Sequence, residues 1–325
     1  MKLLVTGAAG FIGSNFVRRM LTGTYPHHAD TTVTVLDKLT YAGVRANLDP
    51  VADSDRYTFV EGDICDGDLL ADLVPGHDAI VHFAAESHVD RSITGASDFV
   101  LTNVLGTQKM LQAALDGGVE RFVHVSTDEV YGSIDEGSWS EDFALAPNSP
   151  YSASKASSDL LARSYHRTFG LDVVITRCSN NYGPYQFPEK VIPLFVTNLM
   201  DGLQVPLYGD GLNVRDWLHV DDHCHGIQLV LDGGRPGEIY NIGGGTELTN
   251  KDLTYRLLEA MGADETSIRP VQDRKGHDRR YSVDIRKISE ELGYQPEVDF
   301  NRGLAETIEW YRANEAWWRP LKGTS

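Results

Sequence analysis

The amino-acid sequence predicts an α/β fold: a doubly wound parallel (Rossmann) sheet with a smaller, partly interleaved C-terminal substrate domain. Short apolar strands alternate with helical patterns through the first half of the chain, which indicates parallel strands joined by crossover helices. A glycine-rich turn directly follows the first strand. Near residue 178 the alternation gives way to irregular, Pro- and Gly-containing segments. We therefore expect a first domain over residues 1–178, with a returning segment near 214–240, and a second over 179–325.

The first strand, at residues 2–6, leads into the spacing G-x-x-G-x-x-G formed by Gly7, Gly10 and Gly13. A helical pattern follows at once, so strand, turn and helix occur in the order that a dinucleotide-binding fingerprint requires. Gly7 permits a tight turn, Gly10 lets the backbone approach a pyrophosphate, and Gly13 lets the helix pack against the strand. The start of this helix is therefore predicted to face phosphates.

The second strand, at residues 32–36, ends in Asp37, which lies 24 residues after Gly13. A carboxylate at this place accepts hydrogen bonds from the adenosine ribose and repels a 2′-phosphate, so NAD is predicted in preference to NADP. Lys38, the next residue, weakens that preference slightly. At the end of the third strand, Asp63 and Ile64 are expected to meet the adenine.

The remaining elements continue the alternation of strands and helices. A run of small residues, Ala84, Ala85 and Ser87, closes the fourth strand and would let the backbone approach the cofactor. Another strand, at residues 216–220, is expected to return to the main sheet. The other expected strands are 57–61, 77–84, 121–125 and 171–176, and the helices are 98–115, 151–169, 222–231 and 249–261.

A group of proton-transfer side chains follows the strand at residues 121–125: Thr127, Asp128, Glu129, and then Tyr151 and Lys155. The last two are four residues apart on a predicted helix and therefore share one face. A free phenol has a pKa near ~10, and a Lys ammonium and a cationic nicotinamide would both lower it. Tyr151 is therefore predicted to take a hydroxyl proton while hydride leaves the same carbon.

Asp128 and Glu129 have a simpler interpretation as a solvated turn or a helix N-cap. A Tyr–Lys pair at this spacing is also common on exposed helices. The occurrence of all four residues in this order behind a nucleotide fingerprint favours catalysis. Since simple oxidation needs one base only, the two carboxylates indicate additional chemistry.

Composition excludes several kinds of partner. The formal net charge is −18 over 325 residues, which argues against nucleic acid and anionic membranes. No apolar run approaches the ~18 residues of a membrane span, and we expect the N-terminus to be a strand and not a signal peptide. The three cysteines are odd in number and widely spaced, so a reducing cytoplasm is the predicted location.

Three histidines, His219, His223 and His225, lie close together in sequence. Zinc ligands are sometimes spaced in this way, but no Cys pair or H-E-x-x-H motif accompanies them. We therefore expect no metal.

Over essentially its whole length the sequence resembles the extended short-chain dehydrogenase/reductase family, and within it the nucleotide-sugar 4,6-dehydratases. Thr127-Asp128-Glu129 is the specific part, because related epimerases lack the Asp–Glu pair. Phe83 and Gln186 stand where many relatives carry leucine and histidine. The resemblance is carried by residues 6–13, 37–41, 82–90, 126–132, 151–155, 179–185, 188–190 and 276–281.

The resemblance implies conversion of dTDP-glucose to dTDP-4-keto-6-deoxyglucose by a homodimer with tightly bound NAD. Helices 98–115 and 152–169 would pair between subunits. Cofactor binding is assigned by the resemblance to Gly7, Gly10, Phe11, Ile12, Gly13, Asp37, Lys38, Thr40, Asp63, Ile64, Ala84, Ala85, Ser87, Thr102, Tyr151, Lys155 and Asn180. Substrate binding is assigned to Ser87, Thr127, Asn181, Glu189, Lys190, Arg215, Asn250, Arg274 and His277.

The implied cycle gives each catalytic residue a role. Tyr151, assisted by Lys155 and Thr127, would deprotonate the 4-hydroxyl, and Glu129 would take the C5 proton. Asp128 would have to be protonated to donate to the departing 6-hydroxyl, and therefore needs a raised pKa. The alternatives are a UDP-glucose 4,6-dehydratase, a nucleotide-sugar 4-epimerase and, from another class, a non-catalytic NAD-sensing protein.

Overall fold

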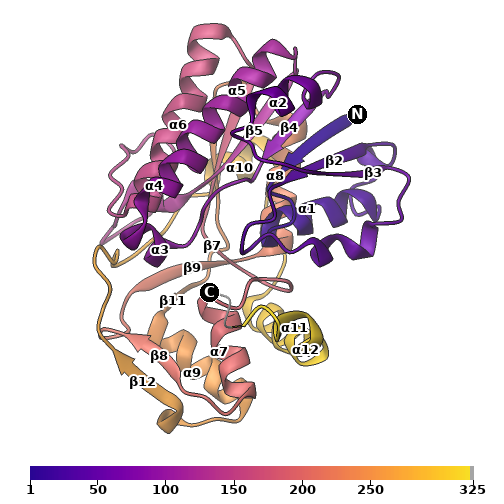
Figure 1. Cartoon of the computed structure of the whole chain (residues 1–325). Helices are drawn as coiled ribbons and strands as arrows, with labels where there is room; N and C mark the ends of the chain where they lie inside the picture. Colours follow the sequence, from indigo (N-terminus) through magenta and orange to yellow (C-terminus); the bar gives the residue numbers. More distant parts are fainter. Residues whose placement is uncertain (323–325) are drawn as a thin grey trace.

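A seven-stranded sheet, parallel throughout, forms the centre of the larger of two lobes in the computed structural model, which describes residues 1–322 (Figure 1). The strand order is β10-β6-β5-β4-β1-β2-β3. This order confirms the predicted doubly wound α/β fold. The strands are β1 (Lys2–Thr6), β2 (Thr32–Asp37), β3 (Tyr57–Glu61), β4 (Ala79–His82), β5 (Arg121–Thr127), β6 (Val173–Cys178) and β10 (Ile239–Ile242).

Helices cover both faces of this sheet because successive strand residues point to opposite sides. In β1, Leu3 and Val5 pack into one hydrophobic core, whereas Leu4 between them packs into the other. The first core is shared with α1 (Phe11–Leu21), α8 (Val220–Gly233) and α10 (Arg286–Leu292). The second is shared with α2 (Gly67–Leu73), α5 (Thr107–Asp116) and α6 (Pro150–Phe169).

The helix predicted at residues 98–115 is interrupted. It consists of α4 (Ala96–Phe99), a π-helical segment η3 (Val100–Gly106) and α5. Within the π segment Asn103 accepts a hydrogen bond from the Glu86 amide and donates to the Glu86 carbonyl and the Ser154 hydroxyl. The π segment therefore ties the chain after β4 to α6. The short helix α3 (Val89–Thr94) precedes it.

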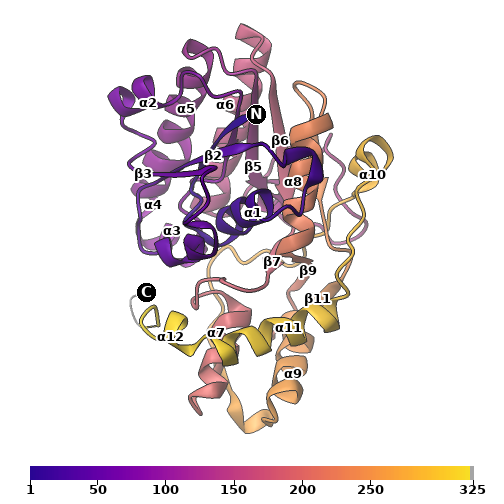
Figure 2. The ribbon, with the colours of Figure 1, turned by 90° about the vertical axis from the view of Figure 1, so that its right-hand side faces the viewer.

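The smaller lobe lies beneath the large sheet in Figures 1 and 2 and has its own hydrophobic core. One small sheet has the order β11-β9-β7, and a second pairs β8 with β12. Its strands are β7 (Asn180–Tyr182), β8 (Val205–Tyr208), β9 (Val214–His219), β11 (Glu247–Thr249) and β12 (Ile268–Val271). Its helices are α7 (Val191–Met200), α9 (Asn250–Met261), α11 (Phe300–Ala313) and α12 (Glu315–Trp318). Short 3₁₀ turns complete the chain: η1 (Pro26–His28), η2 (Arg45–Val51), η4 (Asp128–Tyr131) and η5 (Glu265–Ser267).

The prediction that residues 216–220 rejoin the main sheet is wrong. Residues 216–219 belong to β9, which pairs with β7 and β11 in the smaller lobe, and Val220 begins α8. The strand that does rejoin the main sheet is β10, beside β6. A strand's hydrophobic pattern indicates that it is a strand but does not identify its partner. Here the buried carboxylate of Asp216 helps to hold β9, because it accepts hydrogen bonds from Ser179 and from the amides of Gly244 and Thr246.

Within residues 1–322, no helix combines the length and the apolar character needed to cross a membrane.

Candidate active site

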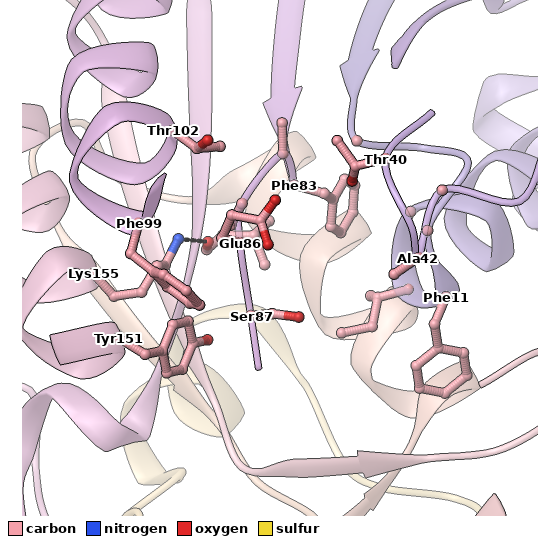
Figure 3. A pocket seen from close by; sticks show the side chains of 18 of the residues that line it. Phe11, Thr40, Ala42, Phe83, Glu86, Ser87, Phe99, Thr102, Tyr151 and Lys155 are labelled. Carbon is pink, nitrogen blue, oxygen red and sulfur yellow. Dashed lines mark hydrogen bonds between the residues drawn. The ribbon is translucent and has the colours of Figure 1, made fainter. Parts of the chain in front are cut away.

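A cavity of about 900 Å³ opens between the carboxyl ends of the large sheet and the smaller lobe (Figure 3). In open α/β sheets ligands bind at this edge. All the residues predicted to bind the cofactor line the cavity, as do the five predicted catalytic residues. In Figure 3, Thr40 and Ala42 lie on one side of it, Tyr151 and Lys155 on the other, and Glu86 and Ser87 between them.

The glycine turn leaves its backbone open toward this cavity. Gly7 has φ +69°, and a Cβ there would lie 2.5 Å from the Ala84 Cα, too close for any other residue. A Cβ on Gly13 would lie 2.8 Å from the Gly7 carbonyl oxygen. Since α1 begins at Phe11, the helix N-terminus adjoins this turn. These features fit the pyrophosphate of a dinucleotide.

Asp37, the last residue of β2, is held by one amide of the glycine turn and one of the loop that follows β2. Its carboxylate accepts hydrogen bonds from the Ala9 and Leu39 amides, both at 2.8 Å. Burial raises the pKa of Asp37, and the two hydrogen bonds oppose that rise. Lys38 is paired with Asp63 at 2.7 Å. A fixed carboxylate at this edge fits the ribose contact that was predicted from its spacing.

Tyr151 and Lys155 occupy the first turns of α6, where Ser149 and Ser152 form a capping box and Pro150 is the first helical residue. The Lys155 ammonium donates to the Val125 carbonyl at 2.9 Å. Burial lowers the pKa of Lys155 to about 8, and the carboxylate of Asp159 opposes the change. Lys155 is therefore held in place while retaining a proton at neutral pH.

The pKa of Tyr151 differs from the prediction. Burial raises it well above its ordinary value, the charges of Glu129 and Asp128 raise it further, and a hydrogen bond with Thr127 lowers it. The predicted lowering is therefore not a property of the polypeptide's own groups. The part of it assigned to a nicotinamide cation stays a prediction.

Asp128 and Glu129 lie side by side in η4, the 3₁₀ turn after β5. Thr127 caps this turn, because its hydroxyl accepts a hydrogen bond from the Glu129 amide at 3.2 Å. Asp128 is 2% exposed. Burial raises its pKa well above the ordinary value, and the negative charges of Glu129 and Asp216 add to the rise. Both effects favour the protonated form of Asp128, which is the form that its predicted role requires.

More cations act on Glu129 than on Asp128, for which Arg215 alone among the cations of the described residues opposes the rise in pKa. Burial raises the pKa of Glu129, whereas the positive charges of Arg274, Arg215 and Lys190 oppose the rise. Two adjacent carboxyls therefore stand in different electrostatic environments. Such a difference is the basis for assigning an acid and a base within one site. The same three cations are the ones that the resemblance assigns to the substrate.

The other predicted substrate residues are more dispersed. Asn181, Glu189 and Lys190 line the cavity, together with Ser87 and Thr127. The remaining four predicted substrate residues are not among the residues that line the cavity. Arg215 stacks on Tyr281 at 4.1 Å, and Arg274 lies 3.6 Å from Asp90. His277 lies 2.6 Å from Asp273, and Asn250 begins α9. The positive charges of Arg215 and Arg274 act to lower the pKa of Glu129 and that of His277.

Several lining residues were not singled out from the sequence, among them Tyr41, Glu86 and Arg91. Tyr41 and Glu86 lie inside motifs quoted for the resemblance, so their place in those motifs could have identified them as candidate site residues. Arg91 follows the last of these motifs by one residue.

The histidines near residue 220 do not gather around one point. His219 caps α8, His223 contacts the Asn181 side chain at 2.9 Å, and His225 lies near Tyr294. Among the residues that the structure describes, no cluster of three or more potential metal ligands occurs.

Comparisons with known proteins agree with this geometry. Residues 4–307 match the family model described as GDP-mannose 4,6 dehydratase. A dTDP-glucose 4,6-dehydratase from Streptomyces niveus is 64% identical over 99% of this chain and 96% of the relative. The crystal structure of DesIV, a dTDP-glucose 4,6-dehydratase from Streptomyces venezuelae with NAD bound, has TM-score 0.98 and 68% identity over 99% of this chain and 100% of that one.

A more distant structure shows how widely the fold is shared. UDP-glucuronic acid 4-epimerase from Bacillus cereus has TM-score 0.90 at 29% identity, covering 96% of this chain and 99% of that chain. The fold alone therefore does not separate dehydration from epimerisation. The high identities over full length do, and the chain belongs to the GDP-mannose 4,6 dehydratase family, among its dTDP-glucose 4,6-dehydratases.

Proposed function

We propose that the protein converts dTDP-glucose to dTDP-4-keto-6-deoxyglucose, with NAD bound throughout the cycle. The observation that carries the proposal is the placement of two carboxyls in different electrostatic environments, Asp128 and Glu129, in one cavity with Tyr151 and Lys155. A 4-epimerase needs Tyr151 and a nicotinamide but leaves both carboxyls without a task. The identity to named dTDP-glucose 4,6-dehydratases supports the same choice.

NAD supplies a hydride acceptor for C4 of the sugar and then a hydride donor for C6. The chain's part is to hold it: the glycine turn receives the pyrophosphate, Asp37 the ribose, and Asp63 with Ile64 the adenine. Tyr151 and Lys155 lie at the opposite side of the cavity from Thr40 and Ala42 (Figure 3), which supports assigning them to the nicotinamide end.

The first proton transfer belongs to Tyr151, which takes the proton of the 4-hydroxyl as C4 is oxidised. Thr127 shares a hydrogen bond with Tyr151, and Lys155 contributes a positive charge one helical turn away. The ketone formed at C4 makes the C5 hydrogen acidic.

The elimination of water divides between the carboxyls. Glu129, whose ionised form is supported by Arg274, Arg215 and Lys190, takes the C5 proton. Asp128, whose protonated form is favoured by burial, gives its proton to the departing 6-hydroxyl, so that water leaves across C5 and C6. After hydride reaches C6, Glu129 returns its proton to C5. Glu129 is thereby restored, and the proton that Tyr151 took from the 4-hydroxyl must pass to Asp128, which gave one to the departing water, before another cycle begins.

The sugar nucleotide carries a diphosphate, and Lys190, Arg215 and Arg274 provide cations for it within an acidic chain. Arg215 suits bidentate phosphate contact. Asn181, Glu189, Asn250 and His277 complete the proposed substrate set. A UDP-glucose 4,6-dehydratase would use the same catalytic residues, and the names of the relatives favour the thymine nucleotide.

We further propose a homodimer in a reducing cytoplasm. Large apolar side chains are exposed on η3 and α6, namely Val100, Leu101 and Leu105 with Leu160. A face of this kind on two neighbouring helices suits burial against its own copy. All three cysteines are free thiols, which supports the cytoplasmic assignment. NAD binding is assigned to residues 1–178 with residues 220–242, which form α8 and β10, as the returning segment, and sugar-nucleotide binding to the rest of 179–325.

The test is proton NMR of the purified protein incubated with dTDP-glucose and no added cofactor. The expected result is a C6 methyl doublet on a 4-keto sugar, and parallel incubation with UDP-glucose determines the base preference. Formation of dTDP-galactose instead would make the protein an epimerase. No change even with NAD supplied, from a protein that binds NAD, would favour the non-catalytic alternative.

A further inference from the structure

Two segments of the large lobe line the cavity from different sides. One is the loop after β2, residues 38–43, and the other follows β4 and reaches Arg91. From the smaller lobe, Phe187, Glu189 and Lys190 line the same cavity. Side-chain contacts join these three segments where they meet.

Tyr41 makes the contact between the first loop and the smaller lobe. Its hydroxyl donates a hydrogen bond to one carboxylate oxygen of Glu189 at 2.9 Å. The Phe187 ring stands nearly perpendicular to the Tyr41 ring at 5.6 Å between centroids. The loop itself has no regular secondary structure, and Leu39 within it has a left-handed backbone, φ 52°. Lys38 and Leu39 attach the start of the loop to Asp63 and Asp37, and the Tyr41 side chain attaches it to the smaller lobe.

Arg91 brings the second segment into the same contact. Its guanidinium carbon lies 3.6 Å from the centre of the Tyr41 ring, and its Nε lies 4.0 Å from the second Glu189 oxygen. His88 Nε2 lies 3.6 Å from that oxygen. Burial lowers the pKa of His88 to about 4, so Arg91 and not His88 supplies the positive charge at neutral pH.

The Glu189 carboxylate is well shielded from water. Its side chain is 5% exposed, and its second oxygen has no hydrogen-bond partner among the described residues. A phenol hydroxyl that donates to a shielded carboxylate forms a stronger hydrogen bond than one between two neutral groups. The resemblance assigned Glu189 to the substrate, yet its contacts reach residues of the cofactor side.

We propose that Tyr41 is a positioning residue that closes the loop at residues 38–43 over the dinucleotide through its hydrogen bond to Glu189 and thereby slows release of NAD. The inference rests on the proposed function, in which NAD is regenerated at each turnover and need not leave. Release would require the loop to move away from the smaller lobe. The Tyr41–Glu189 hydrogen bond and the Arg91 stacking must break for that movement.

The test follows cofactor exchange and not turnover. Holoenzyme carrying radiolabelled NAD is mixed with excess unlabelled NAD, and retained label is measured by filtration over time. Tyr41→Phe removes the hydroxyl and keeps the ring, and we expect about tenfold faster loss of label, the effect of one hydrogen bond to a charged group. Tyr25→Phe is the matched control, because its hydroxyl contacts Arg19 on α1, away from the cavity.

A second variant removes the acceptor of this hydrogen bond, which lies on the smaller lobe. Glu189→Ala should also speed the loss of label, and the double variant Tyr41→Phe with Glu189→Ala should be no faster than the more affected single variant. Additive effects would overturn the inference, as would equal rates for Tyr41→Phe and wild type. Wild-type protein that retains no NAD would overturn the proposed function together with it. Thermal unfolding of each variant shows whether the fold is retained.

Discussion

The negative charge of Glu129 raises the pKa of Asp128, its neighbour in the buried turn after β5. Proximity of two like charges penalises ionisation of both, and the side chains around the pair decide which one keeps a proton. Here Arg274, Arg215 and Lys190 act on Glu129. The surroundings of the turn therefore favour a proton on Asp128 more than on Glu129, as the proposed roles of acid and base require.

Replacing Asp128 with Asn should separate oxidation from dehydration. Asn cannot give a proton to the departing hydroxyl, so overall turnover should fall at least about 100-fold while oxidation at C4 continues. Absorbance of reduced nicotinamide should then build up after mixing with dTDP-glucose. Asp135→Asn, at an exposed position, is the control. If no reduced nicotinamide accumulates, Asp128 is not the acid.

Replacing Tyr151 with Phe should prevent the first hydride transfer. Without the phenol the 4-hydroxyl has no base, and we expect a loss of about 100-fold or more in the rate of nicotinamide reduction. Rapid mixing with substrate measures this single step directly. Near-normal reduction would remove Tyr151 from the role of base.

Replacing Arg274 with Gln should move the pH dependence of C5 proton removal. Arg274 is the cation that lowers the pKa of Glu129 most, so its loss should raise that pKa. A base works only when ionised, and the acidic limb of the rate profile should therefore shift upward by about one pH unit. Exchange of the C5 hydrogen for deuterium, followed across pH, measures the shift. Arg269→Gln, exposed on β12, should leave the profile unchanged.

Asp159 should govern acid stability. It is fully buried and contacts Arg177 at 2.9 Å and His124 at 3.3 Å. Its pKa is lowered to about 2 against the opposing effect of burial, chiefly by Arg177 and His124. A group whose pKa is lower in the folded state stabilises the fold above its unfolded pKa. About 2 kcal/mol should therefore be lost as pH falls from about 4 toward 2.

The variant Asp159→Asn extends this prediction. It leaves Arg177 buried without its counter-charge and should cost about 3–5 kcal/mol in the free energy of unfolding at neutral pH. The difference from wild type should narrow in acid, where Asp159 itself becomes neutral. Urea unfolding at neutral and acidic pH measures both quantities, with the exposed Asp53→Asn as control. A difference that is constant across pH would contradict the assignment.

The proposed dimer predicts sensitivity to charge on η3. Leu101 is 52% exposed and Leu105 is 41% exposed on the same segment. Changing both to Asp should convert dimers to monomers, because two charges would be buried in the subunit contact. Size-exclusion chromatography with light scattering reports the mass. Leu203→Asp, an equally exposed position beyond α7, should leave the mass unchanged.

The features that could be predicted from the sequence are local ones. Gly7, Gly10 and Gly13 occupy fixed places in a strand–turn–helix unit, and Tyr151 and Lys155 share a face because of helix geometry alone. The position of Asp37 follows from its place at the end of a predicted strand. In each case a few neighbouring residues determine the geometry, so spacing was sufficient.

The features that could not be predicted depend on residues far apart in the chain. The raised pKa of Asp128 requires burial and the charge of Asp216, which lies on another sheet. The pairing of β9 and β10 depends on which edge each strand reaches, and alternation of apolar residues does not encode it. The hydrogen bond between Tyr41 and Glu189 joins residues 148 positions apart.

The course of the chain between the lobes has an evolutionary consequence. After entering the smaller lobe at β7, the chain returns to the large sheet with α8 and β10, leaves it for β11 and α9, and visits it again at α10. A different smaller lobe therefore cannot be acquired by recombining one contiguous stretch of the gene. Divergence toward new sugar nucleotides must proceed by point substitutions and loop changes within an undivided chain.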